Sequence, residues 1–238
     1  MELSVLLVGG IAVLLSAFVQ GSVGLGLSLV AVPVVALLDP SLLPGSTLLL
    51  GAVMPALTML HEWRHVSWSD AGWLTGARLV TTPLGVLVVS WLSAETIGIA
   101  VGVGVLLAVA LTAWKFDVRP SRPNLALAGA VAGVSSTAAG IAGPPAAIVL
   151  QREQGSRLRA TLAAFFLIGA TSSLVALAVG GQLHERQLGY GAGWIPFVVA
   201  GFGLAIPLQN RLPAQLLRSS VLVLSAVSAV AVLLRSLF

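Results

Sequence analysis

The residues of this chain that could do chemistry lie in two glycine-containing interruptions of long apolar stretches. The first reads Gln20-Gly21-Ser22-Val23-Gly24-Leu25-Gly26, and the second reads Ser135-Ser136-Thr137-Ala138-Ala139-Gly140-Ile141-Ala142-Gly143-Pro144-Pro145. A helix that starts inside a membrane leaves about four backbone N–H groups unpaired and carries roughly half a positive charge there. Such a start binds the oxygens of an anion, and glycine lets the anion approach the amides closely. The two interruptions therefore predict an anion-binding site built from two helix starts.

Polar side chains and glycines around the interruptions are the candidate ligands of this anion. The hydroxyls and the Gln20 amide would form a neutral lining, and proline at positions such as 144 suits a first helical turn. The predicted substrate-binding residues are Gln20, Gly21, Ser22, Gly24, Gly26, Ser28, Thr47, Arg78, Ser136, Thr137, Gly140, Gly143, Pro144 and Thr161. The alternative is that the glycines and small residues only permit close helix packing.

Three of the candidates, Thr47, Arg78 and Thr161, lie in other apolar segments, and each has two interpretations. Thr47 and Thr161 begin the apolar segment after each interruption, where they either line the pocket or cap their own helix. Arg78 is the basic residue placed most clearly within a span. It either attracts an anion in the pathway or extends its side chain to the membrane interface. For Arg159, at the start of a later segment, a gating role and a lipid contact are both open.

Composition places these residues in a membrane protein. Hydrophobic residues make up 58 % of the 238 positions, charged residues make up 8 %, and the mean hydropathy is +1.04. A soluble domain carries about 25 % charged residues, so this chain has too few charges to cover a water-facing surface. The net charge of +4 comes from arginines in short loops, where they set topology, and we expect no nucleic-acid partner. Cysteine is absent, which excludes disulfides and thiolate metal sites.

Ten apolar segments, separated by charged and turn-forming residues, predict an all-α polytopic membrane protein. They cover roughly 3–20, 25–38, 45–60, 71–92, 95–114, 124–139, 143–151, 159–180, 190–209 and 214–237. Segments 25–38 and 143–151 are too short to cross a bilayer upright at about 1.5 Å per residue. Each is expected to form a broken or re-entrant helix pair with the segment before it, where protein or a water-filled cavity satisfies the freed backbone groups.

The two halves of the chain, 1–118 and 119–238, resemble each other and predict two five-segment repeats within one transport domain. Gly24-Leu25-Gly26 aligns with Gly140-Ile141-Ala142, and Thr47-Leu48 aligns with Thr161-Leu162, at a nearly constant offset. Each repeat carries its broken pair near its start. Because each half makes an odd number of crossings, the two repeats are expected to be inverted relative to one another.

The distribution of basic residues predicts the orientation in the membrane. Loops on one side carry or adjoin Arg64, Lys115, Arg119, Arg122, Arg152, Arg157, Arg159, Arg211 and Arg218, whereas the other side carries Arg186 and Arg235. By the positive-inside rule the first side is cytoplasmic. The protein is therefore expected in the inner (plasma) membrane with both termini on the extracytoplasmic side.

The interruptions also resemble the signatures of a known family. Gly21-Ser22-Val23-Gly24-Leu25-Gly26 followed by Pro33 resembles the first-half signature of the TauE/SafE sulfite exporter family. The stretch Gly140 to Pro145, with Arg159-Ala160-Thr161-Leu162 and Phe165-Phe166, is similar to its second-half signature. Leu27 and Ala142 stand where another glycine is common in that family. The resemblance implies transport of small anions, such as sulfite, thiosulfate, or sulfonates including sulfoacetate and 4-toluene sulfonate, without identifying which one.

The expected function is thus a secondary transporter that exports small sulfur-containing anions by alternating access. The alternative is a membrane-embedded structural or accessory subunit that transports nothing. No enzyme activity, cofactor or metal is expected, because the chain lacks a nucleotide phosphate-binding loop and any catalytic triad or carboxylate pair. His61, Glu62 and His65 lie close together in sequence, but no matching set of metal ligands follows them. His61 or His65 could carry a coupling proton, but an interfacial loop anchored by tryptophans explains the cluster more simply. The oligomeric state stays open.

Overall fold

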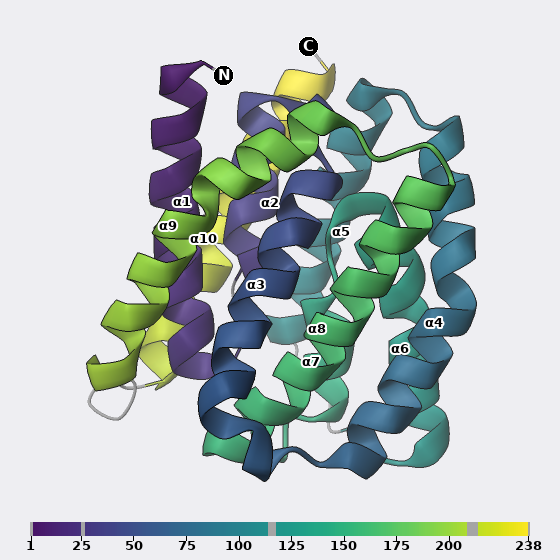
Figure 1. The fold of residues 1–238 in the computed structure, drawn as a ribbon, viewed down its shortest axis with the longest axis vertical. Helices are drawn as coiled ribbons and strands as arrows, with labels where there is room; N and C mark the ends of the chain where they lie inside the picture. The colour runs from purple at the N-terminus through teal and green to yellow at the C-terminus, as the bar shows by residue number, and fades with distance from the viewer. Residues whose placement is uncertain (1, 25–26, 114–117, 209–213, 238) are drawn as a thin grey trace.

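The computed structural model describes residues 2–24, 27–113, 118–208 and 214–237, and within them the chain is helical and has no β-strand (Figure 1). The all-α fold class is confirmed, and each predicted segment corresponds to one helix. The α-helices are α1 (Leu3–Val23), α2 (Leu27–Leu38), α3 (Gly45–Glu62), α4 (Trp68–Trp91), α5 (Ala94–Ala113), α6 (Arg122–Ala139), α7 (Gly143–Val149), α8 (Gly155–Val179), α9 (Glu185–Leu208) and α10 (Ala214–Leu237). Two 3-10 turns, η1 (Pro40–Leu42) and η2 (Trp63–His65), flank α3.

The distribution of side chains in this bundle is that of a membrane protein. Of the described helices, four are long and apolar enough to cross a bilayer, namely Leu3–Ser22, Trp68–Trp91, Gly155–Val179 and Glu185–Leu208. Large apolar side chains such as Val80 and Val179 point outwards, at 78 % and 86 % exposure. Hydroxyl side chains such as Ser46, Thr137 and Ser173 are instead buried. Exposed apolar side chains together with buried hydroxyl groups suit lipid as the surrounding solvent.

Helices of the two halves of the chain interleave. The most extensive helix contacts join α4 to α6, α1 to α9, α3 to α8 and α5 to α10, and each of these pairs takes one helix from residues 1–118 and one from 119–238. The hydrogen bond from Trp194 Nε1 to the Leu6 carbonyl, 3.0 Å long, belongs to the contact between α1 and α9. The chain therefore folds as one body whose halves share a common interior.

The contact between α4 and α6 depends on two glycines of α6. A Cβ at Gly129 would lie 2.8 Å from the carbonyl carbon of Leu74, and a Cβ at Gly133 would lie 2.6 Å from the carbonyl oxygen of Arg78. Thr81 Oγ1 donates to the Ala130 carbonyl across the same contact, at 2.8 Å. These small residues bring the two backbones together and fix the height of the α4 segment that carries Arg78.

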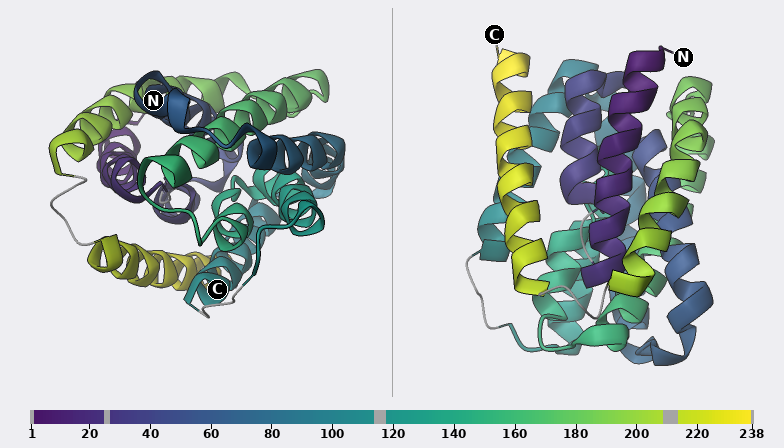
Figure 2. Two further views of the ribbon diagram at one scale, coloured as in Figure 1. Left: turned by 90° about the horizontal axis from the view of Figure 1, so that it is seen from below. Right: turned by 90° about the vertical axis from the view of Figure 1, so that its left-hand side faces the viewer.

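The bundle has two ends of different charge. Both termini lie at one end, which we call the terminal end (Figures 1 and 2). The turn between α3 and α4, the start of α6 and the loop between α7 and α8 lie at the opposite end. Those segments contain Arg64, Arg119, Arg122, Arg152 and Arg157, so we call it the basic end.

Candidate functional site

The first helix break is held by the side chain of Gln20. Gly24 ends α1 in the left-handed conformation, with φ 84°, and its N–H donates to the Gln20 carbonyl at 2.7 Å. The amide oxygen of the same Gln20 side chain accepts the N–H of Leu27, the first residue of α2, at 3.0 Å. Gln20 therefore binds both sides of the break, and the Leu27 amide is already satisfied by the chain itself.

The second helix break follows the same plan with different residues. Gly140 ends α6 in the left-handed conformation, with φ 74°, and Ser135 Oγ donates to the Ile141 carbonyl at 2.7 Å. The helix that follows, α7, is only seven residues long and has prolines at positions 144 and 145. Since proline has no N–H, this helix start offers an anion fewer backbone donors than a start without proline would.

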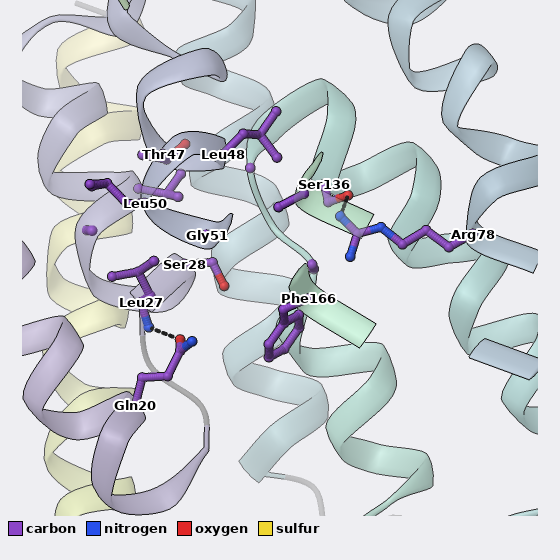
Figure 3. Close-up of a pocket in the computed structure, with 15 residues that line it drawn as sticks. Gln20, Leu27, Ser28, Thr47, Leu48, Leu50, Gly51, Arg78, Ser136 and Phe166 are labelled. Carbon is purple, nitrogen blue, oxygen red and sulfur yellow. Dashed lines mark hydrogen bonds between the residues drawn. The ribbon is translucent and has the colours of Figure 1, made fainter. Parts of the chain in front are cut away.

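A cavity of about 40 Å³ lies between the two breaks (Figure 3). Its wall combines both halves of the chain. The lining residues are Gln20, Leu27, Ser28, Ala31, Val32, Thr47, Leu48, Leu50, Gly51, Arg78, Ser136, Gly140, Ala142, Phe166 and Ala170. Of the predicted binding residues, the structure brings Gln20, Ser28, Thr47, Arg78, Ser136 and Gly140 together here. Most of the remaining wall is apolar.

Arg78 supplies a positive charge at this cavity. Its side chain extends from α4 towards Ser136 (Figure 3), and Nη2 donates to Ser136 Oγ at 2.8 Å. The residue is only 1 % exposed, so the interpretation that it extends to the membrane interface is wrong. No carboxylate of the described residues pairs with it, and its Nε and Nη1 have no hydrogen-bond partner there. A buried, unpaired cation is costly, and an anion in the cavity would supply the missing charge.

Two residues of α8 hold the guanidinium in place. The Arg78 Cζ lies 4.9 Å from the centre of the Phe165 ring, within the range of a cation–π contact. Gly169 leaves the space that the guanidinium occupies, because any Cβ at that position would overlap it. Arg78 is thus positioned by Phe165, Gly169 and Ser136 rather than by a counter-ion.

The other predicted residues make contacts away from the cavity. Ser22 Oγ donates to the carbonyl of Phe18 in its own helix, and Gly21 packs against Ala205. Thr137 shares a hydrogen bond with Ser173, and Thr161 Oγ1 accepts the N–H of Ser67 at 3.0 Å. Gly24, Gly143 and Pro144 are buried but do not line the cavity, and Gly26 lies outside the described residues.

The apolar lining was not predicted from the sequence. Leu27, Val32, Leu48 and Leu50 are indistinguishable by type from the many core leucines and valines of a membrane bundle. Phe166 is one of the signature residues of α8, so its place in that motif was the available signal.

The histidines near the end of α3 do not gather around a common point. His61 Nδ1 lies 3.0 Å from the Leu57 carbonyl, and its ring meets Phe202 edge-on. Glu62 pairs with Arg159 instead, and His65 is exposed. Across the part of the chain that the structure describes, no three His, Asp or Glu side chains are grouped as metal ligands would be.

Replacing Gly140 by alanine should lower the free energy of unfolding by about 1–2 kcal/mol, the cost of a left-handed conformation for an L-residue. The added Cβ would also lie 2.8 Å from Thr47 Oγ1. Thermal unfolding of the purified protein in detergent measures the effect. Gly203→Ala on α9 is the matched control, because a Cβ there meets open space. Equal unfolding temperatures for the two variants would contradict the need for glycine at the break.

The fold and the cavity define a class, a multi-pass helical membrane protein with broken helices around an internal cationic cavity. A family model described as "Sulfite exporter TauE/SafE" matches residues 9–232. The chain belongs to this family of membrane transporters. No curated protein and no solved structure matches it.

Proposed function

We propose that this protein is a secondary transporter that exports small sulfur-containing anions, such as sulfite, sulfonates or thiosulfate, by alternating access around the cavity. The observation that carries the proposal is Arg78, a cation buried at the cavity with no counter-ion among the described residues. A bound oxyanion would accept hydrogen bonds from its free Nε and Nη1, and charge-assisted bonds of this kind are strong. Ser28 and the Gln20 amide lie on the cavity wall and could complete the polar contacts.

Inverted repeats are part of this proposal, and the helix contacts support them. Exchanging α1–α5 with α6–α10 converts the contact of α1 with α9 into that of α6 with α4. It converts the contact of α2 with α10 into that of α7 with α5, and both members of each pair of contacts occur. In addition, α1 runs from the terminal end whereas α6 runs from the basic end (Figure 1). Such pairs of repeats allow one site to face either side of a membrane in turn.

The proposed orientation follows the charge of the two ends. The basic end would face the cytoplasm under the positive-inside rule, and both termini would lie on the other side of the inner (plasma) membrane. The boundary between the two proposed repeats lies near residue 118, between α5 and α6.

The test of the proposed function is anion flux into proteoliposomes that contain the purified protein. Sulfite, an alkyl sulfonate and thiosulfate are offered separately as labelled substrates, and each unlabelled anion is then tested as a competitor. We expect saturable flux of at least one of them above that of protein-free liposomes. No flux and no competition would contradict the transporter, and would favour the accessory subunit whose glycines serve helix packing alone.

A further inference from the structure

The end of α3 and the start of α8 are joined by an ion pair between Glu62 and Arg159. Arg159 Nε donates to both carboxylate oxygens at 3.1 Å, and Nη2 donates to Oε1 as well. The Arg159 side chain is 11 % exposed and that of Glu62 is 15 % exposed. The pair is therefore largely withdrawn from water, and it connects the two halves of the chain.

Both residues continue helix faces that line the cavity. On α8, Arg159 precedes the lining residue Phe166 by two helical turns, which is about 10 Å at 1.5 Å per residue. On α3, Glu62 follows the lining residue Gly51 by three turns on the same face. Since α3 and α8 pack against each other along these faces, the ion pair lies between them beyond the basic end of the cavity.

Arg159 also contacts the first helix break. A Cβ at Gly24 would lie 3.2 Å from Arg159 Cγ and 3.4 Å from its Cα. Arg159 therefore meets the left-handed end of α1 and the end of α3 at one point. Two residues further along α8, Thr161 Oγ1 accepts a hydrogen bond from the N–H of Ser67, the residue before α4. The ends of α1 and α3 and the starts of α4 and α8 therefore meet near the pair.

The ion pair at the terminal end has a different character. Arg186 Nη2 lies 2.8 Å from Asp39 Oδ2, but the Arg186 side chain is 55 % exposed. Asp39 also accepts hydrogen bonds from Ser41 in its own loop. A solvent-exposed pair of this kind contributes little to stability, so it serves as a matched comparison for the buried pair.

We propose that Arg159 is a second anion-binding station at the basic end of the transport path, and that Glu62 is its resident counter-ion, displaced by the substrate when that end opens. The inference rests on the proposed function. A guanidinium binds a carboxylate, a sulfonate or sulfite through the same planar fork of N–H donors. An oxyanion can thus replace the Glu62 carboxylate without leaving Arg159 unpaired. With Glu62 in place, its negative charge and the contact of α3 with α8 close this end to anions.

The test uses the absence of cysteine from the chain. A single Ala31→Cys substitution places a thiol on the cavity wall, and a membrane-impermeant methanethiosulfonate carrying a sulfonate group reports access to it. Reagent is added separately to inside-out and right-side-out vesicles. Adding Glu62→Gln should raise the rate of modification from the basic end by about tenfold or more, because the closed state loses its ion pair.

Two variants make the result specific. Asp39→Asn, which breaks the exposed pair, should leave access from the basic end unchanged. Glu62→Asp keeps the charge, so it should stay near the parent and shows that the site tolerates substitution. Unchanged access in Glu62→Gln would overturn the proposal.

The anion-binding role has its own measurement. Glu62→Gln removes the internal competitor, so the substrate concentration that half-saturates flux from the basic end should fall by about tenfold. A purely structural ion pair predicts no decrease, and a half-saturating concentration that is unchanged or higher would contradict the second station. Cavity access needs no transport, so it tests the closure even if the proposed function fails in the flux assay.

Discussion

Replacing Arg78 by glutamine should reduce anion flux by about a hundredfold. The guanidinium has two N–H-bearing nitrogens without partners at the cavity. Hydrogen bonds from a charged donor contribute about 1.5–3 kcal/mol each, so losing two of them at the lower end corresponds to this factor at about 1.4 kcal/mol per tenfold. The measurement is initial flux into proteoliposomes over a range of substrate concentrations, with Arg78→Lys expected to fall between parent and glutamine because it keeps the charge but not the fork.

The control for Arg78 is Arg157→Gln at the start of α8. Arg157 is 57 % exposed and pairs with Glu153 on the surface, so its loss should change flux less than twofold. Size-exclusion profiles and unfolding temperatures establish that both variants are folded. Parental flux with a parental half-saturating concentration in Arg78→Gln would show that the anion does not bind at this residue.

The second large effect is expected at Gly133, where α6 meets α4. A valine there would place its Cβ 2.6 Å from the Arg78 carbonyl oxygen, and it would also overlap the Thr81 hydroxyl. Overpacking against a backbone costs about 1–3 kcal/mol, and this contact has no flexible side chain that could make full room. We expect a loss of free energy of unfolding at the upper end of that range, and it is measured as a lower unfolding temperature. Flux should fall by more than tenfold, because displacing α6 separates Ser136 from Arg78.

Gly76→Val on α4 is the matched control for Gly133→Val. Gly76 is exposed, and a Cβ there has no neighbour within 4 Å, so the same chemical change should leave unfolding and flux near parental values. Gly133→Ala should give an intermediate result, since it adds the Cβ alone. If Gly133→Val behaves like Gly76→Val, close approach of the two helices does not position Arg78.

The helices could be predicted from the sequence because a membrane allows few alternatives. Long apolar stretches must pair their backbone groups internally, so 71–92 was predicted and α4 covers Trp68–Trp91. The two breaks were predicted for a similarly local reason, because glycines interrupt both apolar stretches. In the structure Gly24 and Gly140 end their helices with positive φ. Signals carried by neighbouring residues were sufficient for both.

The direction of individual side chains could not be predicted in the same way. Ser22 and Thr137 have the hydroxyls that an anion site needs, but one binds its own helix and the other binds Ser173. Thr161 Oγ1 accepts a hydrogen bond from the backbone N–H of Ser67, which is 94 residues away in sequence. The rotation of each helix about its axis decides these contacts, and that rotation depends on partners distant in the chain.

The interleaving of the two halves has a consequence for how the protein is made. The backbone N–H of Glu2 donates to the hydroxyl of Tyr190 at 2.8 Å, across 188 residues of sequence. During synthesis α1 enters the membrane long before α9 has been made. In the same way α4 is made before α6, the helix against which it packs. Contacts between residues so far apart form slowly, so the buried polar groups of the first half, Arg78 among them, spend that time without their final partners. Assembly of this protein therefore ends with its last helices, and a chain stopped at its midpoint would hold a charged residue in the bilayer with nothing built to enclose it.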